Sequence, residues 1–166
     1  MSIRLREIRK VFGDGTVALD GLDLDIASGE FLVLLGPSGC GKSTACRILA
    51  GLDRPTTGTV EVAGKDVTDL PPRQRGMSMV FQNYALYPHK TVYDNIAYPL
   101  RVRGRSGTRA SGDIDQAVRE MAEILGISRL LRRRPRQLSG GEAQRVAVAR
   151  ALVWQPDICL MDEPLS

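Results

Sequence analysis

The most informative segment of this 166-residue chain is Gly36-Pro37-Ser38-Gly39-Cys40-Gly41-Lys42-Ser43-Thr44. It fits the pattern G-x-x-x-x-G-K-[ST], in which glycines let backbone N–H groups surround phosphate oxygens at the start of a helix. Lys42 can reach the β- and γ-phosphates, and the Ser43 hydroxyl can ligate Mg²⁺. The segment therefore predicts a site for a nucleoside triphosphate rather than an ordinary glycine-rich turn.

The residues around this segment predict an α/β fold. Residues 31–35 form a short, continuously apolar run, which is typical of a strand buried on both faces of a sheet. A helix is expected to follow the glycine-rich loop, from Lys42 to about Leu52. The other strands expected from the apolar pattern are residues 3–5, 22–26, 59–62, 77–81 and 158–161.

Between residues 83 and 137 the pattern changes from strands to helices. Apolar spacing predicts one helix over 91–103, which Pro99 must end or kink, and another over 114–125 with Gly126 as its C-cap. The segment 101–113 has the composition of a flexible linker. A last helix is expected over residues 140–154. The expected parts are residues 1–82 (β subdomain and phosphate-loop core), 83–137 (helical subdomain) and 138–166 (a helix and an acid-tipped strand).

The composition restricts the class of protein. The chain is 43% hydrophobic and 25% charged, which is typical of a globular domain, and its longest apolar run is far too short to cross a membrane. Its few cysteines and single histidine favour neither a disulfide framework, nor a zinc site, nor a Ser-His-Asp triad. The first residues lack the apolar core of a signal peptide, so we expect a cytosolic chain or one that docks on a membrane through a partner.

Positive charge is concentrated in one part of the chain. The net charge is +4, and residues 101–136 hold ten arginines against four acids. A basic stretch of this kind can meet a phosphate-rich surface, but a solvated helical face is the more common explanation. We therefore expect no nucleic-acid partner.

A second motif complements the phosphate loop. The apolar run 158–161 is followed by Asp162 and Glu163, so two carboxylates come at the end of an expected strand. At the carboxyl edge of the sheet they would lie beside the phosphate loop. Asp162 is then expected to hold Mg²⁺ through water, and Glu163 to act as the base that polarises the attacking water.

A third motif, Leu138-Ser139-Gly140-Gly141-Glu142, admits two interpretations. Ser139 and Glu142 form the S-x-x-E pattern of a capping box, which starts a helix for local reasons. The two glycines are poor helix formers, by about 1 kcal/mol each, and a cap needs neither of them. A helix N-terminus with exposed amides is also what an anion site requires, and both interpretations can hold together.

These motifs carry a resemblance. The segments GPSGCGKST, LSGGEAQR and ICLMDEP, in that order, resemble the nucleotide-binding subunit of ATP-binding-cassette (ABC) transporters. Residues 80–96, VFQNYALYPHKTVYDNI, are similar to that family's glutamine loop. Their sequence most resembles that of carbohydrate-import ATPases of the maltose, multiple-sugar and glycerol-phosphate type. The resemblance implies a P-loop NTPase (RecA-like) core with an antiparallel β subdomain and an inserted α-helical subdomain.

The resemblance also implies roles for single residues. Phe12 matches the aromatic residue that stacks on adenine. Gln82 matches the catalytic-site glutamine that senses Mg²⁺ and the γ-phosphate and links to the transport partner. Ser139, Gly140 and Gly141 would contact the γ-phosphate of ATP held by a second subunit in a head-to-tail dimer. Glu142 departs from the family's pattern, which has glutamine there.

The function implied by this family is ATP hydrolysis that drives solute import, with ATP and Mg²⁺ as cofactors. The implied partners are a second ATPase subunit, transmembrane permease subunits and, indirectly, a solute-binding protein. The chain would then lie on the cytoplasmic side of the inner membrane as a peripheral subunit. Carbohydrate is the expected solute, with polyamine, iron or anion import as alternatives. Three other kinds of ATPase fit less well. A DNA-maintenance ATPase would carry long coiled coils, and this sequence has no sustained heptads. A translation ATPase would carry two cassettes, whereas this chain has one phosphate loop, and a P-loop kinase would leave residues 138–142 unexplained.

The resemblance further implies segments that the family has after the position of Ser166 and that this sequence does not contain. The family continues with an Asn-Leu-Asp loop and a strand that ends in a histidine near the γ-phosphate, and sugar importers add a regulatory β-rich domain. We therefore expect a cassette from which the C-terminal part of the core is missing. The alternative function is a remnant that binds nucleotide weakly without turnover.

Overall fold

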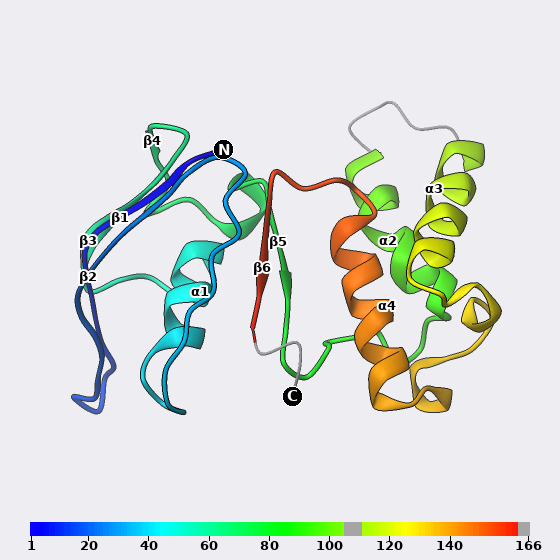
Figure 1. Cartoon of the computed structure of the whole chain (residues 1–166), viewed down its shortest axis with the longest axis horizontal. Coiled ribbons are helices and arrows are strands. Elements are labelled where there is room, and N and C mark those ends of the chain that lie inside the picture. The colour runs from blue at the N-terminus through cyan, green and yellow to red at the C-terminus, as the bar shows by residue number, and fades with distance from the viewer. Residues whose placement is uncertain (105–110, 163–166) are drawn as a thin grey trace. The chain divides into compact units, whose positions relative to one another are not determined.

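The computed structural model in Figure 1 describes residues 1–104 and 111–162. The chain divides into two compact units, Met1–Met77 and Ser78–Ser166. The expected division into residues 1–82, 83–137 and 138–166 stays a prediction.

The first unit contains an antiparallel sheet. Its strands are β1 (Ile3–Val11), β2 (Val17–Ile26), β3 (Thr57–Val62) and β4 (Lys65–Asp66), in the order β2-β1-β3-β4. Alternation along β1 buries Ile3 and Leu5. At Glu7 the backbone enters the left-handed region, with φ 48°, and the register shifts between Leu5 and Ile8. This bulge keeps Ile8 on the buried face.

Helix α1 (Lys42–Ala50) belongs to the same unit and carries the phosphate loop at its N-terminus. Its other end is held by Arg75, which is only 5% exposed and follows the short 3₁₀ helix η1 (Pro72–Gln74). The Arg75 guanidinium donates to the carbonyl oxygens of Ile48 and Leu49 at 2.7 and 2.9 Å. Because the last carbonyls of a helix have no partner within it, this buried arginine completes α1.

The strand predicted over residues 31–35 is wrong for this structure. Among the described residues, this segment pairs with no strand, and Phe31 and Leu35 are each 88% exposed. A strand buried on both faces needs neighbouring strands for its N–H and C=O groups and side-chain layers for its faces. The apolar run is present in the sequence, but the described residues supply neither for it.

The second unit contains a strand pair and a group of helices. The strands are β5 (Met77–Val80) and β6 (Ile158–Met161), paired as a two-stranded sheet. The helices are α2 (Val92–Gly104), α3 (Ser111–Ile124), the 3₁₀ helices η2 (Ser128–Leu130) and η3 (Pro135–Gln137), and α4 (Gly140–Leu152). Figure 1 shows α4 between the β5–β6 pair and helices α2 and α3.

Helix α4 is buried on two faces, which explains its apolar sequence. Val146 and Ala149 join the core formed with α2 and α3, whereas Ala147 and Ala151 pack with Val80 of β5. The strand expected over 158–161 is therefore confirmed, as are the strand expected over 77–81 and the helix expected over 140–154, which end one and two residues earlier.

The helices before α4 agree with expectation in extent and depart from it in the linker. Helix α2 covers the residues predicted for the first helix, with each end shifted by one, and it continues past Pro99, although Pro99 offers no N–H to the carbonyl of Asn95. The predicted linker 101–113 is too long, because residues 101–104 belong to α2 and 111–113 belong to α3. Its middle, residues 105–110, lies outside the described residues.

Candidate nucleotide-binding site

The phosphate loop curves around the side chain of its lysine. The Lys42 ammonium donates to the carbonyl oxygens of Gly36 and Pro37, both at 2.9 Å. The Cys40 sulfur lies 3.8 Å from the same nitrogen. The positive charge of Lys42 is therefore placed at the N-terminus of α1, where the helix dipole also favours an anion.

Gly41 is required by the backbone at this point. It is the N-cap of α1 with φ 92°, in the left-handed region, and a Cβ atom on it would lie 2.5 Å from the carbonyl oxygen of Ala18. Because glycine has no side chain, Gly41 places no capping side chain over the first turn of α1. The loop thus places one ammonium at the start of α1, and a phosphate loop of this sequence is expected to bind a polyphosphate through its backbone N–H groups.

Phe12 lies at the turn between β1 and β2, in the same unit as the phosphate loop. Its ring is 40% exposed, and the Lys10 ammonium lies 5.2 Å from the ring centroid. Ala18, one residue into β2, approaches Gly41 closely, so this hairpin packs beside the start of α1. The position of Phe12 supports its predicted role as a base-stacking residue, which stays a prediction.

Gln82 and Asp162 each lie just after the C-terminal end of a strand of the β5–β6 pair. The backbone N–H of Asp162 donates to the carbonyl of Val80 at 3.0 Å, and Gln82 follows Val80 by two residues. Two of the three residues predicted to hold Mg²⁺ therefore follow the ends of paired strands in the second unit. Glu163 lies outside the described residues.

The donor set fits Mg²⁺ bound together with phosphate. Among the described residues there is no group of three or more His, Cys, Asp or Glu side chains arranged to hold a metal. Mg²⁺ in nucleotide sites commonly uses one or two carboxylates, waters and the phosphates themselves, so the carboxylate of Asp162, the hydroxyl of Ser43 and the amide of Gln82 are suitable kinds of ligand. Their joint role as Mg²⁺ ligands stays a prediction.

The N-terminus of α4 forms the predicted capping box. The Ser139 hydroxyl oxygen accepts from the N–H of Glu142 at 3.3 Å, and a Glu142 carboxylate oxygen accepts from the N–H of Ser139 at 3.0 Å. A Cβ on Gly140 would come no nearer than 3.9 Å to the Tyr84 hydroxyl, and one on Gly141 no nearer than 3.9 Å to Arg145. Packing among the described residues requires neither glycine, and their role in an anion site stays a prediction.

Arg150 is a residue of this region that the sequence reasoning missed. Its guanidinium donates to the carbonyls of Ala85 at 2.7 Å and Tyr84 at 3.0 Å, and stacks 5.5 Å from the centroid of Tyr87. Tyr84 and Ala85 have φ values of 59° and 44°, so Arg150 secures a strained loop two residues after Gln82. The available signal was a single arginine within the apolar helical run VAVARALV.

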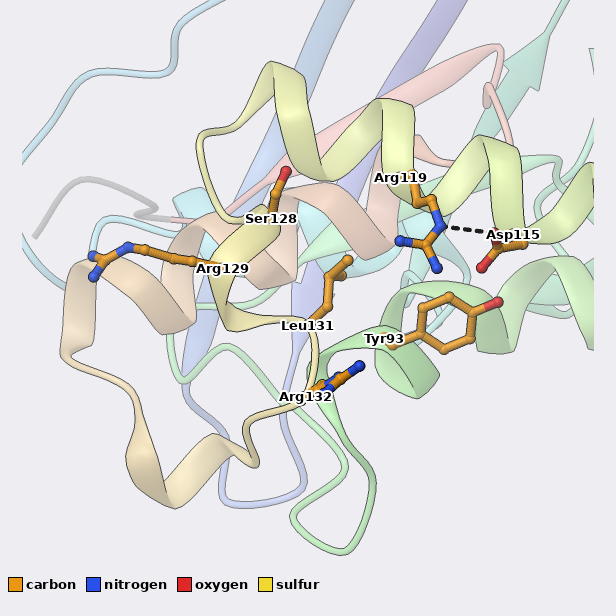
Figure 2. Close-up of a pocket in the computed structure, with 7 residues that line it drawn as sticks. All are labelled: Tyr93, Asp115, Arg119, Ser128, Arg129, Leu131 and Arg132. Carbon is orange, nitrogen blue, oxygen red and sulfur yellow. Dashed lines mark hydrogen bonds and ion pairs between the residues drawn. The ribbon is translucent and has the colours of Figure 1, made fainter.

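A separate cavity of about 430 Å³ lies among the helices of the second unit, and Figure 2 shows the side chains around it. It is lined by Tyr93, Asp115, Arg119, Ser128, Arg129, Leu131 and Arg132. Arg119 pairs with Asp115 at 2.7 Å inside this cavity, whereas Arg129 points away from the other labelled side chains. Burial and the neighbouring Asp115 raise the pKa of Tyr93. The cavity contains no residue predicted to bind the nucleotide.

Nearly the whole chain is similar to import proteins of known sequence. The chain is 52% identical, over 164 residues, to the sn-glycerol-3-phosphate import ATP-binding protein UgpC of Cupriavidus metallidurans. It is 52% identical, over 170 residues, to the trehalose/maltose import ATP-binding protein MalK of Thermococcus litoralis. Each alignment covers 99% of this chain but 44% of the relative, so the chain spans less than half the length of these relatives.

A solved structure gives the same result for the fold. The dimeric post-hydrolysis structure of the ATP-binding cassette MJ0796, bound to ADP and Pi, superimposes with a TM-score of 0.90 at 35% identity. The match covers 98% of this chain and 74% of that one. The predicted α/β fold of a P-loop ATPase is confirmed. No helix within the described residues is long and apolar enough to span a bilayer.

The family follows from the extent of these matches. A family model for ABC transporters matches residues 19–166, which include the phosphate loop, the segment 138–142 and Asp162. The resemblance drawn from the motifs is therefore confirmed, and the chain belongs to the ABC transporter family.

Proposed function

We propose that the protein binds and hydrolyses ATP as the ATP-binding subunit of an importer for carbohydrate or glycerol phosphate. The observation that carries this proposal is the phosphate loop, where Gly41 is held at φ 92° against the backbone of Ala18 and Lys42 lies within the curve of the loop. The names of the similar import proteins support the choice of solute.

The residues of the first unit would bind and orient the nucleotide. Lys42 and the first-turn amides of α1 hold the β- and γ-phosphates, and they stabilise charge that develops on the transferred phosphoryl group. The exposed ring of Phe12 stacks on the base. Mg²⁺, when bound, neutralises phosphate charge, and Ser43, Gln82 and Asp162 are the residues that would hold it.

Glu163 would orient the attacking water and accept its proton. In the sequence it comes directly after Asp162, the residue proposed as the Mg²⁺ carboxylate. Gln82 would contact the same water or metal from the end of β5. Arg150, by holding the carbonyls of Tyr84 and Ala85, keeps the Gln82 loop in one conformation.

The N-terminus of α4 would complete the site of a second subunit. The Ser139 oxygen accepts a bond from the N–H of Glu142, so its hydroxyl proton is available to a phosphate oxygen. Gly140 and Gly141 are exposed, and packing does not explain why both positions are glycine. We propose that their amides bind the phosphate. The dimeric state of the similar cassette MJ0796 supports a dimer, for which we propose the head-to-tail arrangement.

The remaining partners follow from the import role. Transmembrane permease subunits would dock near the Gln82 loop, and a solute-binding protein would act indirectly through them. The subunit would then work at the cytoplasmic face of the cell membrane as a peripheral protein. The import function of the similar proteins supports this placement.

The test uses the complete protein and a Glu163→Gln variant. Removing the carboxylate removes the base but keeps the shape of the site, so ATP should remain bound and the dimer should persist. Light scattering after size-exclusion chromatography should show an ATP-dependent dimer, and phosphate release should fall to the background set by Lys42→Ala. Normal turnover in Glu163→Gln would exclude Glu163 as the base, and a wild-type protein without turnover would overturn the proposed function.

A further inference from the structure

We propose that Arg129 is a positioning residue for the N-terminus of α4, where it neutralises Glu142 so that Ser139, Gly140 and Gly141 can accept a phosphate. The inference rests on the proposed function, because it concerns how this helix end receives the γ-phosphate held by a second subunit. It assigns a role to a residue outside the sequence motifs.

The two oxygens of the Glu142 carboxylate have different partners. One accepts from the backbone N–H of Ser139 at 3.0 Å, and the other lies 3.0 Å from a terminal nitrogen of Arg129. The Glu142 side chain is only 13% exposed, whereas the Arg129 side chain, on η2, is 71% exposed. Glu142 is therefore fixed within one turn of the Ser139 hydroxyl, and Arg129 approaches it from solvent.

This arrangement creates a conflict of charge. A carboxylate in the first turn stabilises a helix through the capping box and the dipole. The same carboxylate accepts the hydrogen bond of the Ser139 N–H, so this N–H cannot bind a phosphate at the same time. The carboxylate also adds a negative charge beside the place proposed for the phosphate. Like charges at this range repel, so Glu142 would weaken phosphate binding unless a cation offsets it.

Arg129 is the cation in the right position to offset that charge. Hydrogen bonding from the Ser139 amide lowers the pKa of Glu142, and the charges of Arg129 and Arg133 lower it further. Glu142 is thus ionised at neutral pH, and its charge has to be compensated rather than removed by protonation. Arg129 alone forms an ion pair with it among the residues that the structure describes.

A simpler role would be that Arg129 only ties η2 to α4. The two roles differ in what happens when Glu142 becomes neutral. A glutamine at position 142 keeps the capping box, because its side-chain oxygen can still accept from the Ser139 amide. With no carboxylate to hold it, the exposed Arg129 side chain is expected to turn into solvent, where its charge is screened and no longer contributes to phosphate binding.

The experiment measures the dissociation constant of the ATP-bound dimer by analytical ultracentrifugation, with the complete protein in the Glu163→Gln background. Arg129→Gln should weaken this dimer by roughly fivefold at low salt, the upper range for a partly exposed ion pair. Arg129→Gln combined with Glu142→Gln should bind as tightly as Glu142→Gln alone. Arg129→Lys should retain most of the affinity, since it keeps the charge.

Two controls separate charge from folding. Arg132→Gln removes the same charge three residues away, from a side chain with no ion pair in the part of the chain described, and should leave the dimer unchanged. The Arg129→Gln effect should also shrink as salt rises from about 50 mM to about 500 mM, which a purely structural tie would not show.

The outcomes are distinct. If Arg129→Gln weakened the dimer equally whether Glu142 is retained or replaced through Glu142→Gln, this inference would be overturned and the proposed function would stand. A protein with native Arg129 and Glu142 that forms no ATP-dependent dimer would overturn both.

Discussion

Helices α1 and α4 both begin at glycines, Gly41 as the N-cap of the first and Gly140-Gly141 as the first residues of the second. At Gly41 the backbone is left-handed, and a Cβ atom would strike the carbonyl of Ala18. At Gly140 and Gly141 the nearest atoms to an added Cβ are side-chain atoms at 3.9 Å. The fold itself therefore explains the glycine at α1, whereas the glycines at α4 need a cause outside the described fold, such as the close approach of a ligand.

The two helix ends also differ in charge. The first turn of α1 begins Lys42-Ser43-Thr44, so a cation accompanies its amides. The first turn of α4 carries Glu142, whose carboxylate already accepts from one amide and pairs with Arg129. An anion can bind α1 with local charge in its favour, whereas at α4 it must share the helix end with a carboxylate.

The largest effect is expected for Gly41→Ala. The change combines a positive φ with a 2.5 Å approach to backbone, and we expect it to lower the free energy of unfolding of the first unit by roughly 3 kcal/mol or more. Urea denaturation of the complete protein measures it. Gly15→Ala is the matched control, because Gly15 has φ 84° but no atom within 4 Å of an added Cβ. Equal losses in both variants would show that strain alone, and not the contact with Ala18, makes Gly41 necessary.

The next effect concerns binding at the same helix end. Lys42→Ala removes the ammonium that lies within the phosphate loop, a charge-assisted contact worth about 1.5–3 kcal/mol. We therefore expect ATP affinity, measured by isothermal titration calorimetry, to fall by roughly tenfold to a hundredfold. The free energy of unfolding without nucleotide should change little, since the Lys42 side chain is solvent-exposed where it bonds the loop. Unchanged ATP affinity would remove Lys42 from the site.

Sequence reasoning predicted well those features that depend on neighbours in the chain. The capping box of Ser139 and Glu142 and the helix after Gly41 follow from local spacing and were confirmed. The strand over residues 31–35 depends on partners elsewhere, and an apolar run cannot report whether those partners are present. The order of motifs indicated the family, but the roles of single site residues stay predictions.

Contacts made by arginines were the features least accessible to prediction. Arg75 completes the end of α1 and Arg150 secures the loop after Gln82, each by bonding carbonyls from distant parts of the chain. In the sequence, Arg75 looks like an arginine of an ordinary surface, and only the apolar residues around Arg150 set it apart. Only the fold shows that Arg75 is buried and that Arg129 meets Glu142 thirteen residues later.

A smaller effect tests whether Ser139 serves the fold, the ligand or both. Ser139→Ala removes the oxygen that accepts from the Glu142 amide and should cost about 1 kcal/mol of stability, the usual worth of an N-cap. Ser139→Asp keeps a capping oxygen and should unfold near the wild-type midpoint. Its added carboxylate should nevertheless abolish the ATP-dependent dimer. A stable Ser139→Asp protein that still dimerises with ATP would restrict Ser139 to its capping role.

The smallest change in stability, and the sharpest contrast with α1, is expected for Gly141→Ala. Since alanine favours a helix and the new Cβ meets only Arg145 at 3.9 Å, thermal unfolding should show stabilisation by roughly 0.5 kcal/mol. Gly112→Ala, in the first turn of α3, adds a Cβ with no atom within 4 Å and should stabilise similarly. Only Gly141→Ala should also reduce ATPase activity, because its methyl group stands where a phosphate would approach. If both variants were more stable and fully active, the glycines of α4 would have no role in binding.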